Sequence, residues 1–176
     1  MKYLIYLIAI ILLLALDLGL FGQLPINGQV PNLLFLLTLY FVLDKKDNDF
    51  LFVAFVCGLF LDFFSVGFFG RFTLAFLLTA FCLRLFSDTV ELGQNFQTLA
   101  SAFMATFTLY SILIFLLEIV VFKFNWSAQA PESKIIFSRF LVNILYNLLL
   151  LYPMHFAFNF LRRTVENLSL RKRIIK

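Results

Sequence analysis

The sequence predicts an all-α fold, a polytopic membrane bundle of about six transmembrane helices with a short second helix. Hydrophobic residues make up 62% of the 176 residues and charged residues only 14%, against roughly 45–50% and about 25% in soluble domains. The apolar residues form long runs separated by short polar stretches. Cys57 and Cys82 lie inside such runs, which excludes a disulfide framework and the spacing of a metal site.

Six apolar runs approach or exceed the length that crosses a bilayer core of about 30 Å. They cover residues 3–21, 31–43, 50–66, 68–86, 96–122 and 136–161. The first run is longer than the core of a signal peptide and no small-residue cleavage pattern follows it, so we expect it to remain as a span. The second run has thirteen residues, which reach only about 20 Å. Since Pro31 suits the first turn of a helix, we expect a short spanning helix there.

The distribution of basic residues predicts the orientation and the domain division. Placing both termini in the cytoplasm puts ten of the fourteen Lys and Arg residues on that side, as the positive-inside rule requires. Residues 1–161 then form a single transmembrane bundle, and residues 162–176 form a basic cytoplasmic tail. This tail should attract anionic lipids by about 1 kcal/mol per charge, although a stop-transfer role explains it without any specific ligand. We expect no nucleic-acid partner, because the basic residues flank apolar segments.

Four ionisable residues fall at one depth in the outer part of the predicted spans: Asp17, Asp62, Arg71 and Glu118. A buried carboxylate keeps its charge at lower desolvation cost beside a guanidinium. We therefore expect Arg71 to pair with Asp62, with Asp17 or Glu118 as further partners. The alternative is that each side chain reaches into the outer headgroups.

Small residues accompany Asp62 on its helix. Ala54, Gly58 and Asp62 recur every four residues, so they share one face where a second helix can approach closely. This stripe fits packing within the bundle or a surface for a partner. Gly67 and Gly70 follow it and predict a tight outer turn.

The sixth predicted span carries Asn143 and Asn147 on one face, which indicates interhelical hydrogen bonds. Pro153 should kink this helix, and another group must then satisfy the freed carbonyl. The single histidine, His155, fits a packing role better than a catalytic one.

Sequence motifs of metalloproteases, serine hydrolases, nucleotide-binding loops and redox proteins do not occur in the chain. Intramembrane hydrolysis would need a nucleophile with a base, or paired acids at matched depth. We therefore expect a protein that is not an enzyme and that holds no cofactor or metal.

Several of these residues together resemble the MreD family of rod-shape-determining proteins. They are the run from Pro31 and Asn32 through five apolar residues, Gly58 and Asp62 with Gly67 and Gly70 behind them, and Asn147 with Pro153 before a basic tail. The similarity extends over most of the chain, and its sharper matches lie between residues 31 and 75.

The resemblance implies a noncatalytic scaffold in the bacterial cytoplasmic (inner) membrane. Such a protein would bind the bitopic protein MreC and help couple MreB filaments to the RodA and penicillin-binding-protein synthases. On this basis Gly58, Asp62 and Arg71 would form an internal strut, and the outer loops would contact partners. The full set of structural or partner-contact candidates is Pro31, Asn32, Gly58, Asp62, Gly67, Gly70, Arg71, Asn143, Asn147 and Pro153.

A second function remains open, a small-solute transporter or a substrate-binding membrane subunit. Six-span vitamin-uptake subunits (S components) are similar in size and layout, and Asp17, Asp62 and Glu118 could line a pocket for a cationic molecule. The two functions differ in whether these acids converge on an open cavity or close upon Arg71.

Overall fold

The computed structural model describes residues 2–26, 28–43, 49–65, 68–87, 96–123 and 133–174; for residues 2, 87, 96, 133–139 and 161–174 it describes the backbone alone. The described part is all-α and confirms the predicted fold class. Its elements are α1 (Lys2–Gly19), the short 3-10 helix η1 (Phe21–Gln23), α2 (Leu33–Leu43), α3 (Phe50–Phe64), α4 (Arg71–Ser87), α5 (Phe96–Lys123) and α6 (Ser133–Ile174).

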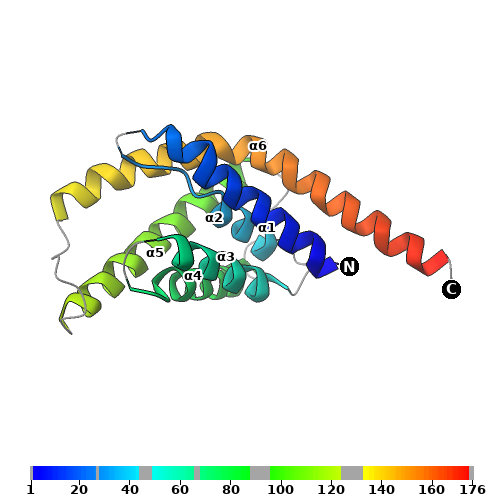
Figure 1. Ribbon diagram of the computed structural model, residues 1–176, viewed down its shortest axis with the longest axis horizontal. Coiled ribbons are helices and arrows are strands. Elements are labelled where there is room, and N and C mark those ends of the chain that lie inside the picture. The colour runs from blue at the N-terminus through cyan, green and yellow to red at the C-terminus, as the bar shows by residue number, and fades with distance from the viewer. Residues whose placement is uncertain are drawn as a thin grey trace.

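The short helix α2 lies at the centre of the bundle (Figure 1). It packs against α1, α3, α4 and α6, and every residue from Leu33 to Val42 is buried. A helix that is apolar on all sides is buried either in protein or in lipid, and here neighbouring helices bury it. The predicted second helix is therefore real and short, and it begins two residues later than the run 31–43.

Aromatic side chains make the contacts between α2, α4 and α5. The Phe35 ring on α2 packs edge-on against Phe76 of α4 and against Phe103 and Phe107 of α5, with Tyr110 beside it. All five residues are buried. Part of the high phenylalanine content thus fills the core.

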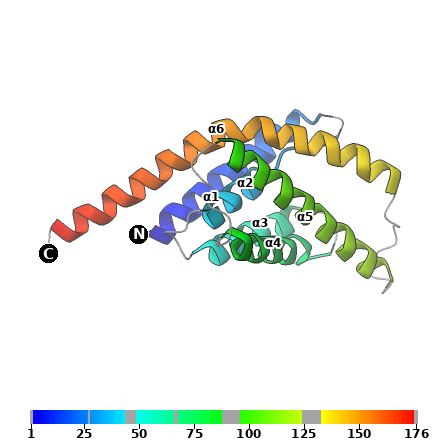
Figure 2. The ribbon, with the colours of Figure 1, turned by 180° about the vertical axis from the view of Figure 1, so that it is seen from behind.

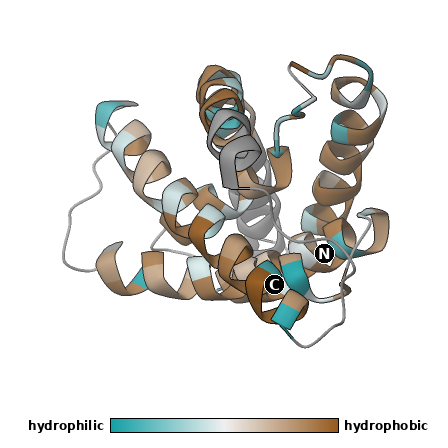
Figure 3. Ribbon diagram, turned by 90° about the vertical axis from the view of Figure 1, so that its left-hand side faces the viewer, coloured by the Kyte–Doolittle hydropathy of each residue, from teal (hydrophilic) through white to brown (hydrophobic). Residues whose placement is uncertain are grey.

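Three segments of the described chain are long and apolar enough to cross a membrane: Tyr3–Gln23, Gln97–Lys123 and Phe140–Phe160. The helices α2 and α3 are apolar but shorter. Hydrophobic residues cover most of the described ribbon (Figure 3), which agrees with a chain that folds in hydrocarbon.

Both termini lie at the same end of the bundle (Figure 1). Seen from front and back, α6 is a long, bowed helix whose C-terminal end extends past the start of α1 (Figures 1 and 2). Its backbone stays helical to Ile174, so the segment predicted as a basic tail continues α6.

Candidate functional site

Asp62 binds the start of α4. Its Oδ1 accepts a hydrogen bond from the Phe72 amide at 2.9 Å, and its Oδ2 accepts bonds from the Thr73 amide at 2.9 Å and the Thr73 hydroxyl at 2.5 Å. The first amides of a helix have no partner within the helix, and their partial positive charge favours a carboxylate. Asp62 is 4% exposed, so it caps α4 from inside the bundle.

Gly58 allows α3 and α4 to approach this closely. A Cβ atom at Gly58 would lie 2.5 Å from the Cα and 2.9 Å from the N of Thr73. Ala54 and Asp62, on the same face of α3, are also buried. The small-residue stripe therefore packs against α4 within the bundle. Gly70, directly before α4, has a φ of 96°, a conformation that glycine adopts without strain.

The expected partner of Arg71 requires a correction. Among the described residues, the salt bridge of Arg71 joins its Nη1 to Oε1 of Glu118 on α5 at 2.8 Å. The sequence predicts Asp62 as the main partner and Glu118 only as an additional one. The physical reason is that both oxygens of Asp62 already accept hydrogen bonds from α4, which leaves the arginine to bridge to α5.

Asp17 caps the start of α2, as Asp62 caps the start of α4. Its Oδ2 and Oδ1 accept hydrogen bonds from the Leu33 amide at 3.0 and 3.3 Å. The Asn32 side chain adds a second cap, because its Oδ1 accepts a bond from the Phe35 amide at 2.9 Å. Asp17 is 6% exposed, so the start of α2 is held by a buried carboxylate.

Asn143 and Asn147 hold the chain that leads into α2. Asn147 Oδ1 accepts a hydrogen bond from the Asn32 amide at 2.8 Å, and Asn143 Nδ2 donates to Oε1 of Gln29 at 3.4 Å. The two asparagines also bond to each other through Nδ2 of Asn147. Nonhelical backbone at membrane depth is tolerated only when protein or water satisfies it. The sequence predicts this polar face on α6, but it predicts bonds to another helix and not to the chain before α2.

The other end of α2 meets a cation. Arg84 Nη1 on α4 donates to the carbonyl of Val42 at 3.0 Å, and its guanidinium lies 5.4 Å from the centre of the Phe50 ring. The helix dipole favours a positive charge at a C-terminus and a negative one at an N-terminus. With Asp17 at one end and Arg84 at the other, α2 is stabilised at both.

Pro153 lies within α6, which continues through it. Near it, the Tyr40 hydroxyl of α2 donates to the carbonyl of Leu151 at 3.1 Å. His155 pairs with Asn159 on its own helix at 3.1 Å and lies beside the Tyr40 ring. The contacts of Tyr40 with Leu151 and His155 therefore attach α2 to α6.

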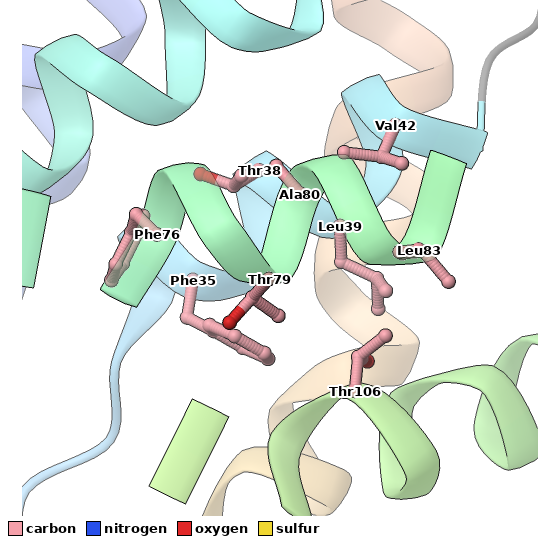
Figure 4. A pocket seen from close by; sticks show the side chains of 9 residues that line it. All are labelled: Phe35, Thr38, Leu39, Val42, Phe76, Thr79, Ala80, Leu83 and Thr106. Carbon is pink, nitrogen blue, oxygen red and sulfur yellow. The ribbon is translucent and has the colours of Figure 1, made fainter. Parts of the chain in front are cut away.

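The three acids do not converge on one cavity. Asp17 binds the start of α2, Asp62 binds the start of α4, and Glu118 binds Arg71. A small cavity of about 10 Å³ lies elsewhere, between α2, α4 and α5, and its lining holds threonine, alanine and larger apolar side chains but no acid (Figure 4). This volume accommodates at most about one water molecule. The described residues hold no group of three or more His, Cys, Asp or Glu side chains placed to bind a metal.

A sequence signal for the two carboxylate caps exists. Leu16-Asp17 and Leu61-Asp62 are each followed by a glycine five residues after the acid, Gly22 and Gly67. Each acid stands two residues before the last residue of its helix. The repeat marks the two places where an acid ends one helix and caps the next. Gly67 itself lies outside the described residues.

The fold and these clusters define an all-helical membrane protein in which Asp17, Asp62 and Asn147 bond from inside the bundle to the starts of helices. A sequence model of the family described as rod shape-determining protein MreD matches residues 1–164. The chain therefore belongs to the MreD family of membrane proteins that determine rod shape. Comparison with curated proteins and with solved structures gives no match.

Proposed function

We propose that this chain is a noncatalytic scaffold of the bacterial cell-elongation machinery. In the cytoplasmic membrane it binds a bitopic protein of the MreC type and helps couple MreB filaments to the RodA and penicillin-binding-protein synthases. Family membership over residues 1–164 carries the proposal. Both chain termini face the cytoplasm, and residues 162–176 supply positive charge toward anionic lipids.

The arrangement of the carboxylates supports a structural role. Both oxygens of Asp17 and both oxygens of Asp62 accept hydrogen bonds from helix amides. Glu118 is paired with Arg71 at 2.8 Å. A general base or a ligand-binding acid must present an oxygen to its substrate, whereas the oxygens of Asp17 and Asp62 face the starts of α2 and α4. Nothing in this geometry favours the transporter alternative, which needs the acids to face a common open cavity.

Affinity capture of the tagged full-length chain in mild detergent tests the proposal. We expect a protein with one transmembrane segment to co-purify with it. Asp62→Ala should weaken this capture by loosening the bundle, whereas Ser111→Ala should leave it unchanged, because the Ser111 hydroxyl bonds only to its own helix among the described residues. A small molecule retained through purification, with no such protein partner, would count for transport and against the scaffold.

A further inference from the structure

The helices of the bundle differ in length. The helices α3 and α4 contain 15 and 17 residues, or about 22 and 25 Å at 1.5 Å per residue. The helix α5, which packs against α4, contains 28 residues, or about 42 Å. A bilayer core of about 30 Å is thus taller than α3 and α4 and shorter than α5.

Hydrogen bonds hold the described part of α4 to its neighbours near both of its ends. At the outer end, Asp62 occupies the first amides of α4. At the inner end, Arg84 is bonded to the carbonyl of Val42. Basic side chains at helix ends often extend outward to lengthen a span, but the Arg71 and Arg84 guanidiniums are directed toward α5 and α2. Neither arginine can therefore make up the missing height.

The outward faces of these two helices are apolar and uncovered. On α3 they present Phe52, Phe55, Phe63 and Phe64, and on α4 they present Leu74, Leu78, Phe81 and Leu85, all 44–66% exposed. The exposed positions extend from the first turn of α3 to its last residue. Hydrocarbon is the medium that such a face fits, because phenylalanine and leucine side chains offer it no polar group.

We propose that the α3–α4 face is a contact surface for phospholipid chains in a locally thinned bilayer. The lipid core beside it is about 5–8 Å thinner than an ordinary one, which is the difference between about 30 Å and the helix lengths. Lipid adapts to a short hydrophobic segment by thinning. The thinning is one-sided, since α5 and the 21-residue segment Phe140–Phe160 of α6 are long enough for a full core. This inference is independent of the scaffold function.

Depth-dependent fluorescence quenching tests the proposal with two matched positions. Phe64 lies two residues beyond Asp62, and Val120 lies two residues beyond Glu118. Both carboxylates are bonded to residues at the start of α4. The two positions therefore lie a similar distance outward from the start of α4. Both side chains are exposed, at 59% and 47%. In a Trp126→Phe background, Phe64→Trp and Val120→Trp each place a single indole on one side of the bundle.

The full-length variants are reconstituted in phosphatidylcholine vesicles brominated either near the headgroup or near the chain end. We expect the indole at position 64 to be quenched more by the headgroup-proximal bromines, and the indole at position 120 to be quenched relatively more by the deep ones. Equal depth profiles at the two positions would overturn the proposal. So would an indole at position 64 that no brominated lipid quenches, because a protein would then cover the face. If Phe64→Trp fails to fold, Phe69→Trp replaces it, because Phe69 is 53% exposed and its ring contacts that of Phe63 beside Phe64.

Discussion

Asp62 shows how a charged residue is accommodated in this apolar chain. It receives three hydrogen bonds from Phe72 and Thr73, and hydrogen bonds to a charged group contribute about 1.5–3 kcal/mol each. An acid at the centre of a span costs about 2.5–3.5 kcal/mol on insertion scales. The bonds to α4 are therefore large enough to offset that cost without an arginine.

Removal of the Asp62 carboxylate should destabilise the bundle. Asp62→Ala leaves two amides at the start of α4 without an acceptor, and each unsatisfied buried donor costs about 1–3 kcal/mol. We expect the free energy of unfolding in detergent to fall by about 2–4 kcal/mol, with Asp62→Asn in between. Ser111→Ala is the control and should change it by less than about 0.5 kcal/mol. Equal effects of Asp62→Ala and Ser111→Ala would contradict the capping role.

The partner of Arg71 can be identified by double-mutant cycles. Arg71→Gln combined with Glu118→Gln should give a coupling energy of about 0.5–1 kcal/mol, since the pair is partly exposed. The cycle of Arg71→Gln with Asp62→Asn should give a smaller value. Stronger coupling to Asp62 would restore the pairing expected from sequence and refute the observed salt bridge.

Sequence could locate these polar residues but not assign their partners. The predicted spans and their orientation place Asp17, Asp62, Arg71 and Glu118 at one depth, and on that basis Asp62 is the expected main partner of the arginine. Which carboxylate meets a helix start depends on how close the backbones come. Gly58 sets that distance through its contact with Thr73, a tertiary fact that residue spacing does not contain.

At the scale of elements, the approach of α3 to α4 depends on the absent side chain at Gly58. Gly58→Ala would force the Thr73 backbone away from a position 2.5 Å from the new Cβ. We expect it to lower the free energy of unfolding by about 1–3 kcal/mol, as overpacking does. Gly19→Ala is the matched control, because no atom lies within 4 Å of its Cβ position. If the two alanines had the same effect, helix propensity alone would explain the result.

The short helix α2 corresponds to the predicted span with the shortest apolar run, residues 31–43. Pro31 and the apolar run after it indicate a helix of about the observed length. Its central position could not be predicted, because an apolar run looks the same whether lipid or protein surrounds it. The bonds from Asp17, Asn147 and Arg84 to its two ends explain how so short a helix is held inside the bundle.

At the scale of the whole molecule, the chain is a bundle whose buried polar groups are used to fix helices. Composition and hydropathy predict the all-α fold. The resemblance around Pro31 and Asp62 predicts the family, which the match to residues 1–164 confirms. The arrangement of the other helices around α2 could not be predicted from the sequence, since it depends on contacts between segments far apart in the chain.

The measurement that tests the scaffold function most directly is cell width after depletion of this protein in its native host. The account predicts that rods widen and round up as the protein is lost. Re-expression of the unaltered chain, or of Ser111→Ala, should restore the width, and Asp62→Ala should restore it poorly. Rods of unchanged width after complete removal of the protein would contradict the proposed function.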